Sequence, residues 1–147
     1  MPKAEHKNFS TPDERKAFPH GKVELLNIGG GTIRRLTLEP GWCWSKDNKP
    51  ATGTEWCEVL HFQYQLSGRM HILMKDGSEF DLGPGDVAAL PSGHDGWVIG
   101  SEPVVLVDWL RQQLCGHLTF SRNAMHNYGE IEYALIASRV VNAAVNK

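Results

Sequence analysis

Short runs of apolar residues, separated by residues that favour turns, recur from residue 22 to residue 110. Each run has the length of a β-strand, and no long amphipathic segment lies between consecutive runs. This spacing predicts an all-β sandwich or closed barrel rather than alternating strands and helices. The runs are VELLNI, TIRRLTLEP, WCEVLHFQYQLSG, RMHILMKDG, SEFDLGPG, DVAALPSG, GWVIGSEP and VVLVDWL.

Glycine, proline and aspartate mark the predicted turns. Asp76 and Gly77 lie between MHILM and SEFDL, and they favour a hairpin because both residues tolerate a positive φ angle. Gly68 divides a longer run into two strands. Residues 83–85 supply the backbone angles of a reverse turn, in which Asp86 can accept a hydrogen bond from the backbone.

The two ends of the chain differ from its middle. Residues 1–22 are polar and contain scattered prolines, which predicts an N-terminal arm that is mobile or orders only against a partner subunit. Residues 23–112 form the predicted barrel, and residues 113–147 form a C-terminal extension. Within that extension, residues 130–145 place apolar side chains at helical spacing, which predicts one helix packed on its own barrel or across a dimer.

The composition agrees with one domain that binds small molecules. The chain has 147 residues, enough for a core that folds without disulfide bonds. Its formal net charge of -2 gives no electrostatic reason to expect binding to nucleic acid or to an anionic membrane. Cys43, Cys57 and Cys115 lack the spacing of a zinc ribbon, and neither a signal peptide nor a transmembrane run is evident, so we expect a reducing cytoplasm.

Residues 82–93, with the sequence LGPGDVAALPSG, resemble the second sequence signature of the cupin barrels: a glycine, five residues, a proline, one residue and a glycine. The segment YQLSGRM around Gly68 is similar to the part that follows the first signature. The resemblance covers about residues 23–109. It implies a double-stranded β-helix, or jelly-roll barrel, that commonly forms homodimers and holds iron, manganese, zinc, nickel or copper.

The resemblance also indicates where metal ligands would lie. The first cupin signature supplies two histidines and a glutamate, and counting back from Gly68 places Glu55, Cys57 and His61 at those positions. Carboxylate, thiolate and imidazole all coordinate first-row transition metals. The three residues are separated by even numbers of residues, so on one extended strand they would all face the barrel interior.

The fourth ligand of the family is missing from its usual place. Gly96 stands where the second signature normally ends with a histidine, and His94 is the alternative ligand two residues earlier. Asp95 is expected to accept a hydrogen bond from an imidazole and so to orient it. Each candidate also has an ordinary structural explanation: a small buried residue for Cys57, a solvated carboxylate for Glu55, a core histidine for His61 and an exposed loop histidine for His94.

Candidate substrate-binding residues continue along the same strand. Gln63 and Gln65 share the face of His61, whereas Tyr64 lies on the opposite face, and Trp97 adds an indole from a later strand. Residues 44–54 form an insertion relative to the family spacing, which we expect to act as a lid at the barrel mouth.

Three functional hypotheses follow. The first is a metal-dependent enzyme of the dioxygenase, isomerase or lyase type acting on a small organic molecule, with a thiolate that favours zinc, iron or copper. The second is a metal-free cupin that binds or senses a small molecule in an indole-rich cavity. The third makes Cys57 a nucleophile beside His61, which is disfavoured because strand residues four apart lie about 13 Å apart at about 3.3 Å per residue.

Overall fold

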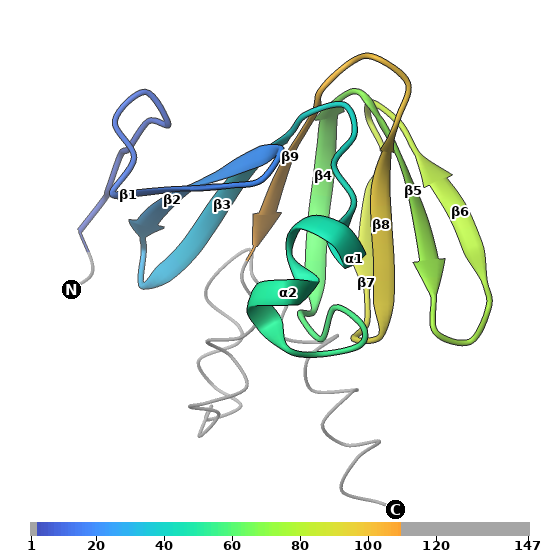
Figure 1. Ribbon diagram of the computed structural model, residues 1–147. Helices are drawn as coiled ribbons and strands as arrows, with labels where there is room; N and C mark the ends of the chain where they lie inside the picture. Colours follow the sequence, from blue (N-terminus) through green and yellow to red (C-terminus); the bar gives the residue numbers. More distant parts are fainter. Residues whose placement is uncertain (1–2, 110–147) are drawn as a thin grey trace, which may run out of the picture. The chain divides into compact units, whose positions relative to one another are not determined.

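The computed structural model describes residues 3–109 (Figure 1). The helix expected at residues 130–145 and Cys115 lie outside the described residues. The described elements are β1 (Glu14–Phe18), β2 (Gly21–Ile28), β3 (Gly31–Leu38), α1 (Trp44–Asp47), α2 (Lys49–Thr52), β4 (His61–Ser67), β5 (Arg69–Met74), β6 (Glu79–Leu82), β7 (Val87–Leu90), β8 (His94–Ile99) and β9 (Val104–Trp109).

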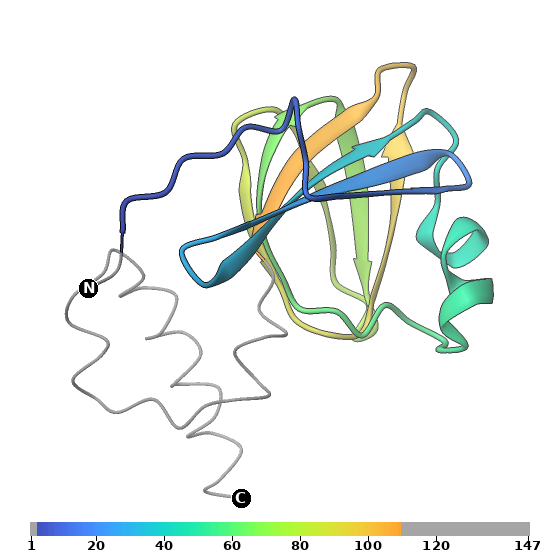
Figure 2. The same ribbon diagram turned by 90° about the vertical axis from the view of Figure 1, so that its left-hand side faces the viewer.

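The strands form two antiparallel sheets, which confirms the predicted all-β class. The larger sheet has six strands in the order β1-β2-β3-β9-β4-β7, and the smaller has three in the order β6-β5-β8. The two sheets face each other in Figure 2, and the core lies between them. The larger sheet contributes Leu38, Val104 and Leu106 to this core, and the smaller contributes Met70 and Ile72.

The predicted turns occur where the glycines and aspartates indicated them. The Asp76-Gly77 hairpin is closed by the backbone N–H of Met74, which donates to Ser78 O at 2.8 Å. Gly68 separates β4 from β5 with a φ of 68°. The eight apolar runs overlap β2 to β9 in order, so the spacing of turn residues was sufficient to locate these strands, although β2, β3 and β8 begin one or two residues before their runs.

The N-terminal region orders against the chain's own sheet. Glu14–Phe18 pair antiparallel with β2 as strand β1, so residue 22 is not a boundary of the sheet. Glu24 is only 1% exposed and accepts hydrogen bonds from Arg15 and Arg35. The Arg35 guanidinium also lies 4.9 Å from the centre of the Phe9 ring. The expectation that this segment is mobile or needs a partner subunit is therefore corrected for residues 9–18.

The insertion at residues 44–54 forms two short helices rather than an open loop. Trp44 is buried at the start of α1 and belongs to the core. The carboxylate of Asp95 on β8 accepts a hydrogen bond from the backbone N–H of Ser45 at 3.1 Å. These contacts hold α1 against β8. In the part of the chain that the structure describes, no helix has the length and apolar character needed to cross a bilayer.

Candidate metal centre

Three side chains with metal-binding atoms meet at one end of the two sheets. His61 begins β4 and His94 begins β8, and both strands start at the lower end of the barrel in Figure 1. Cys57 forms an isolated antiparallel bridge with His94, in which the backbone N–H of Cys57 donates to His94 O at 2.8 Å. The bridge brings a residue that precedes β4 to the beginning of β8.

The ligand atoms of Cys57, His61 and His94 all lie within 4.8 Å of one another. The sulfur of Cys57 is 3.8 Å from Nε2 of His61. The two imidazole rings are edge-to-face, with their centroids 5.1 Å apart. This separation suits three ligands of one metal ion, because such ligands lie around a common centre at about 2.0–2.3 Å from it.

Each imidazole is oriented by a hydrogen bond from its Nδ1 atom. Nδ1 of His61 lies 2.6 Å from a carboxylate oxygen of Asp108, and Nδ1 of His94 lies 2.8 Å from the backbone oxygen of Pro91. Since both partners are acceptors, each ring carries its proton on Nδ1 and offers the lone pair of Nε2. A histidine that ligates a metal usually donates its other ring N–H to a carboxylate or backbone carbonyl in this way.

Asp108 on β9 joins this centre to two neighbouring strands. Its side chain is fully buried. One carboxylate oxygen contacts His61 and the guanidinium of Arg34, and the other accepts the backbone N–H of Phe62 at 3.1 Å. Burial alone would raise the pKa of Asp108, but the His61 hydrogen bond and the charge of Arg34 outweigh it, so the pKa is lowered. Asp108 therefore remains a carboxylate.

The titration properties of the two buried candidate ligands follow from their surroundings. Burial raises the pKa of the Cys57 thiol, although a backbone hydrogen bond and the charge of Arg34 oppose the increase. Burial and the nearby His61 lower the pKa of His94, which favours the neutral imidazole. A metal ion would need to displace the thiol proton, whereas His94 can bind without losing one.

Sequence reasoning missed Asp108 and Arg34. Both are charged residues at inward-facing positions of strands that are otherwise apolar on that face: Asp108 follows Val104 and Leu106, and Arg34 precedes Leu36. The register pairs Arg34 directly with Asp108. The alternation of each strand contained this signal, because a charge at a buried position needs a partner.

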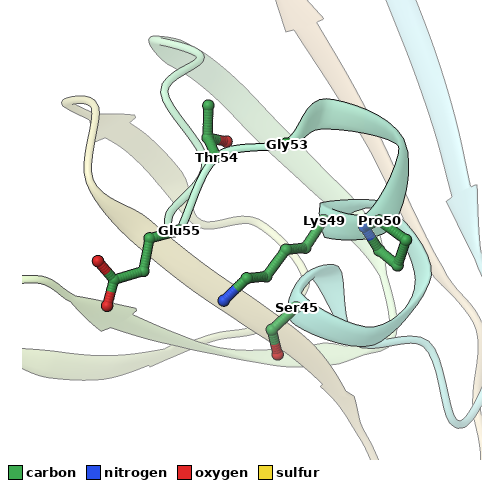
Figure 3. Close-up of a pocket in the computed structure, with 6 residues that line it drawn as sticks. All are labelled: Ser45, Lys49, Pro50, Gly53, Thr54 and Glu55. Atoms are coloured by element: carbon green, nitrogen blue, oxygen red, sulfur yellow. The ribbon is translucent and has the colours of Figure 1, made fainter.

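The structure does not bring Glu55 to the centre, so its expected place among the ligands is corrected. β4 begins only at His61, and the chain turns at Cys57 to bridge with His94, so even spacing along one strand does not describe this segment. Glu55 is exposed and lies at a surface pocket of about 590 Å³ (Figure 3). That pocket is lined by Ser45, Lys49, Pro50, Gly53, Thr54 and Glu55.

The candidate substrate-binding residues on β4 differ in their surroundings. Gln63 is 3% exposed, and its amide nitrogen lies 3.9 Å from the sulfur of Met70. Gln65 is fully buried, and its amide donates to the backbone oxygens of Gly68 and Leu82, which gives it a structural role. Tyr64 is exposed on the outer face of the sheet, so the expectation that it binds an interior substrate is corrected.

Two residues expected near the centre from β8 face the other way. Trp97 stacks on His71 with ring centroids 4.5 Å apart, and it lines a surface pocket of about 300 Å³. Asp95 binds the backbone of Ser45 rather than an imidazole. Both residues alternate with His94 along β8, so they point away from the barrel interior, and Trp97 does not contact the candidate metal centre.

Comparisons with known proteins agree with this architecture. The coconut allergen cocosin matches with a TM-score of 0.51 and 16% identity over 67% of this chain and 30% of that chain. A cupin-2 domain protein from Rhodospirillum rubrum matches with a TM-score of 0.48 and 20% identity over 71% of this chain and 65% of that one. The chain has the cupin fold.

This chain is also similar to a variant of Bacillus subtilis oxalate decarboxylase, with a TM-score of 0.46 and 25% identity over 62% of this chain. It spans only 26% of that enzyme's length. No protein-family profile matches the sequence, and no curated protein matches it significantly. These likenesses concern the fold, and the function has to be argued from the centre itself.

Proposed function

We propose that this cupin is a metal-dependent enzyme that acts on a small organic molecule, with a divalent transition metal bound by Cys57, His61 and His94. The proposal rests on one observation: the three ligand atoms lie within 4.8 Å of one another. A site with three protein ligands leaves a coordination position for substrate, as catalytic metal sites do. The bound metal would act as a Lewis acid or activate oxygen.

The donor set limits the choice of metal. One thiolate and two imidazoles favour zinc, iron or copper over manganese, which prefers carboxylate and water ligands. One matched structure describes Mn(II) centres in Bacillus subtilis oxalate decarboxylase. Mn(II) prefers oxygen ligands, whereas the centre proposed here contains the sulfur of Cys57. The reaction type stays within dioxygenation, isomerisation and lyase chemistry.

The remaining groups of the centre would position the ligands. Nδ1 of His61 donates to the Asp108 carboxylate at an N···O distance of 2.6 Å. Nδ1 of His94 donates to the backbone oxygen of Pro91 at 2.8 Å. These bonds fix the rotation of each ring and direct Nε2 toward the metal. The position of Cys57 is fixed in a different way, because its backbone is bridged to β8.

The alternative role of Cys57 as a nucleophile is less well supported, although the thiol and His61 are close. Their separation of 3.8 Å is shorter than the distance expected for an extended strand, because Cys57 precedes β4 and bridges to His94 on β8. Burial raises the pKa of the Cys57 thiol, whereas a nucleophilic cysteine needs a lowered one. A bound metal supplies the deprotonation that this environment opposes.

Elemental analysis tests the proposal directly. The protein, purified without a chelating tag, should contain close to one equivalent of transition metal. His61→Ala, His94→Ala and Cys57→Ser should each lower the metal content by about tenfold or more under competition with a chelator. Cys43→Ser and His71→Gln are matched controls, because they change the same residue types outside the cluster and should retain the metal.

Two results would contradict the proposal. One is a wild-type protein that takes up no metal even when zinc, iron or copper is supplied during refolding. The other is full metal content in all three ligand variants, with circular dichroism showing the native fold. The first result would favour the metal-free cupin that binds an organic molecule directly.

A further inference from the structure

Arg34 is a cationic side chain beside the candidate centre whose hydrogen-bonding capacity is only partly used. It lies on β3, directly opposite Asp108 on β9. Its side chain is 16% exposed, so a small ligand can still reach part of it. Among the described residues, the Nε atom is buried without a hydrogen-bond partner, and the bonds of the guanidinium come from Nη2.

The contacts of Arg34 use only part of its hydrogen-bonding capacity. A guanidinium has five N–H donors. Nη2 binds the Asp108 carboxylate and lies 3.4 Å from Nδ1 of His61. The second contact is not a hydrogen bond when Nδ1 carries the proton that His61 donates to Asp108. Within residues 3–109 the guanidinium therefore makes one hydrogen bond, to Asp108, and its Nη1 group makes none.

Gln63 is a second underused polar group on the same inner wall. The register places it opposite Asp108 on the other side of β9 from Arg34, so the three side chains form one row across adjacent strands. Its amide is nearly fully buried, and the sulfur of Met70 at 3.9 Å is a weak acceptor. An oxygen acceptor of a ligand could replace this weak bond with a stronger one.

The charges at this end of the barrel favour a monoanion. Arg34 and Asp108 compensate each other. With a divalent metal bound, a Cys57 thiolate and two neutral imidazoles would leave one net positive charge. A carboxylate has that charge, and its two oxygens can bind a guanidinium and a metal at the same time.

Resting on the proposed metal function, we propose that Arg34 binds the carboxylate group of a small anionic substrate at the metal centre, with Gln63 as a second contact. The substrate class is then a small carboxylic acid. The guanidinium would place the substrate with one carboxylate oxygen toward the open coordination position.

The test uses the full-length protein loaded with cobalt(II), whose visible absorption reports on ligands entering the coordination sphere. Sodium acetate should change this spectrum saturably, whereas acetamide, which has the same shape without the charge, should not. Arg34→Gln should weaken acetate binding by about 10-fold to 100-fold. Arg69→Gln is the matched control, because this exposed arginine pairs with the exposed Asp81 on the smaller sheet, and it should bind acetate within about twofold of wild type.

The outcomes separate the two proposals. A wild-type protein that binds no cobalt contradicts the metal function and this inference together. Normal cobalt binding, with equal responses to acetate and acetamide or with acetate binding unchanged in Arg34→Gln, overturns the inference alone. A stronger response to inorganic phosphate than to acetate also overturns the carboxylate assignment. If Arg34→Gln loses cobalt, Arg34→Lys decides: it should bind acetate more weakly than wild type because it lacks the planar fork.

Discussion

At the scale of single residues, the Asp108 carboxylate connects three neighbouring strands at the candidate metal centre. It binds Arg34 from β3 and both the His61 ring and the Phe62 backbone from β4. It holds the His61 ring through Nδ1, so in the proposed metal site it would leave Nε2 for the metal. The same carboxylate compensates the charge of Arg34.

Asp108→Asn should therefore have two separate effects. We expect metal affinity to fall by about 10-fold to 100-fold, because the amide orients His61 poorly. We also expect the free energy of unfolding of the metal-free protein to fall by about 3–5 kcal/mol, because Arg34 loses its buried counter-ion. A competition titration with a chelating indicator measures the first effect, and urea denaturation measures the second.

Asp81→Asn is the matched control for this prediction. Asp81 also binds a histidine, at 2.6 Å from Nδ1 of His71, but it lies on the exposed face of the smaller sheet. The control should keep the wild-type metal affinity. If Asp108→Asn and Asp81→Asn bind metal equally well, Asp108 does not position a ligand.

At the scale of elements, the connection between β4 and β5 requires a glycine for two reasons. Gly68 has a φ of 68°, in the left-handed region that side chains with a Cβ rarely adopt. A Cβ built at this position would also lie 2.4 Å from the backbone oxygen of Pro103, which cannot move aside as a side chain can. Gly77 in the β5–β6 hairpin shares only the first property, since a Cβ there meets nothing within 4 Å.

The two glycines predict different costs for the same substitution. Gly77→Ala should lower the free energy of unfolding by about 1–2 kcal/mol, because only the backbone conformation is strained. Gly68→Ala should cost about 1–3 kcal/mol more, because β4 or the loop at Pro103 has to shift. Urea denaturation of both variants gives the comparison. Equal losses would mean that the contact with Pro103 is relieved without cost.

At the scale of the whole molecule, Glu24 attaches the N-terminal region to the barrel and makes stability depend on pH. Burial alone would raise the pKa of Glu24, but the hydrogen bond and positive charge of Arg35, the hydrogen bond of Arg15 and the charge of Lys22 outweigh it and lower the pKa below its ordinary value of 4.5. The folded chain therefore binds this proton more weakly than the unfolded chain. The stabilisation is complete above pH 4.5 and is lost as the pH falls through the folded-state pKa.

Glu24→Gln should remove this contribution. Near pH 7 the variant should be less stable than wild type by about 1.5–3 kcal/mol, since it lacks the charge-assisted hydrogen bonds. The difference should shrink below pH 4.5, where the wild-type carboxylate becomes protonated. Urea denaturation across this pH range measures it, with the exposed Glu14→Gln as control. A difference that stays constant from pH 7 to pH 3 would contradict the assignment.

The sequence by itself determined the order of β2 to β9, because strand period and turn chemistry are local properties. Through a family resemblance it also selected four candidate ligands, Glu55, Cys57, His61 and His94, of which the structure brings the last three together. The tertiary structure decided which neighbours complete the centre. Asp108 and Arg34 reach His61 from other strands, and the bridge to β8 brings Cys57, but not Glu55, to the centre. Contacts of this kind depend on strand register across the sheet, which the spacing of residues along one strand does not specify.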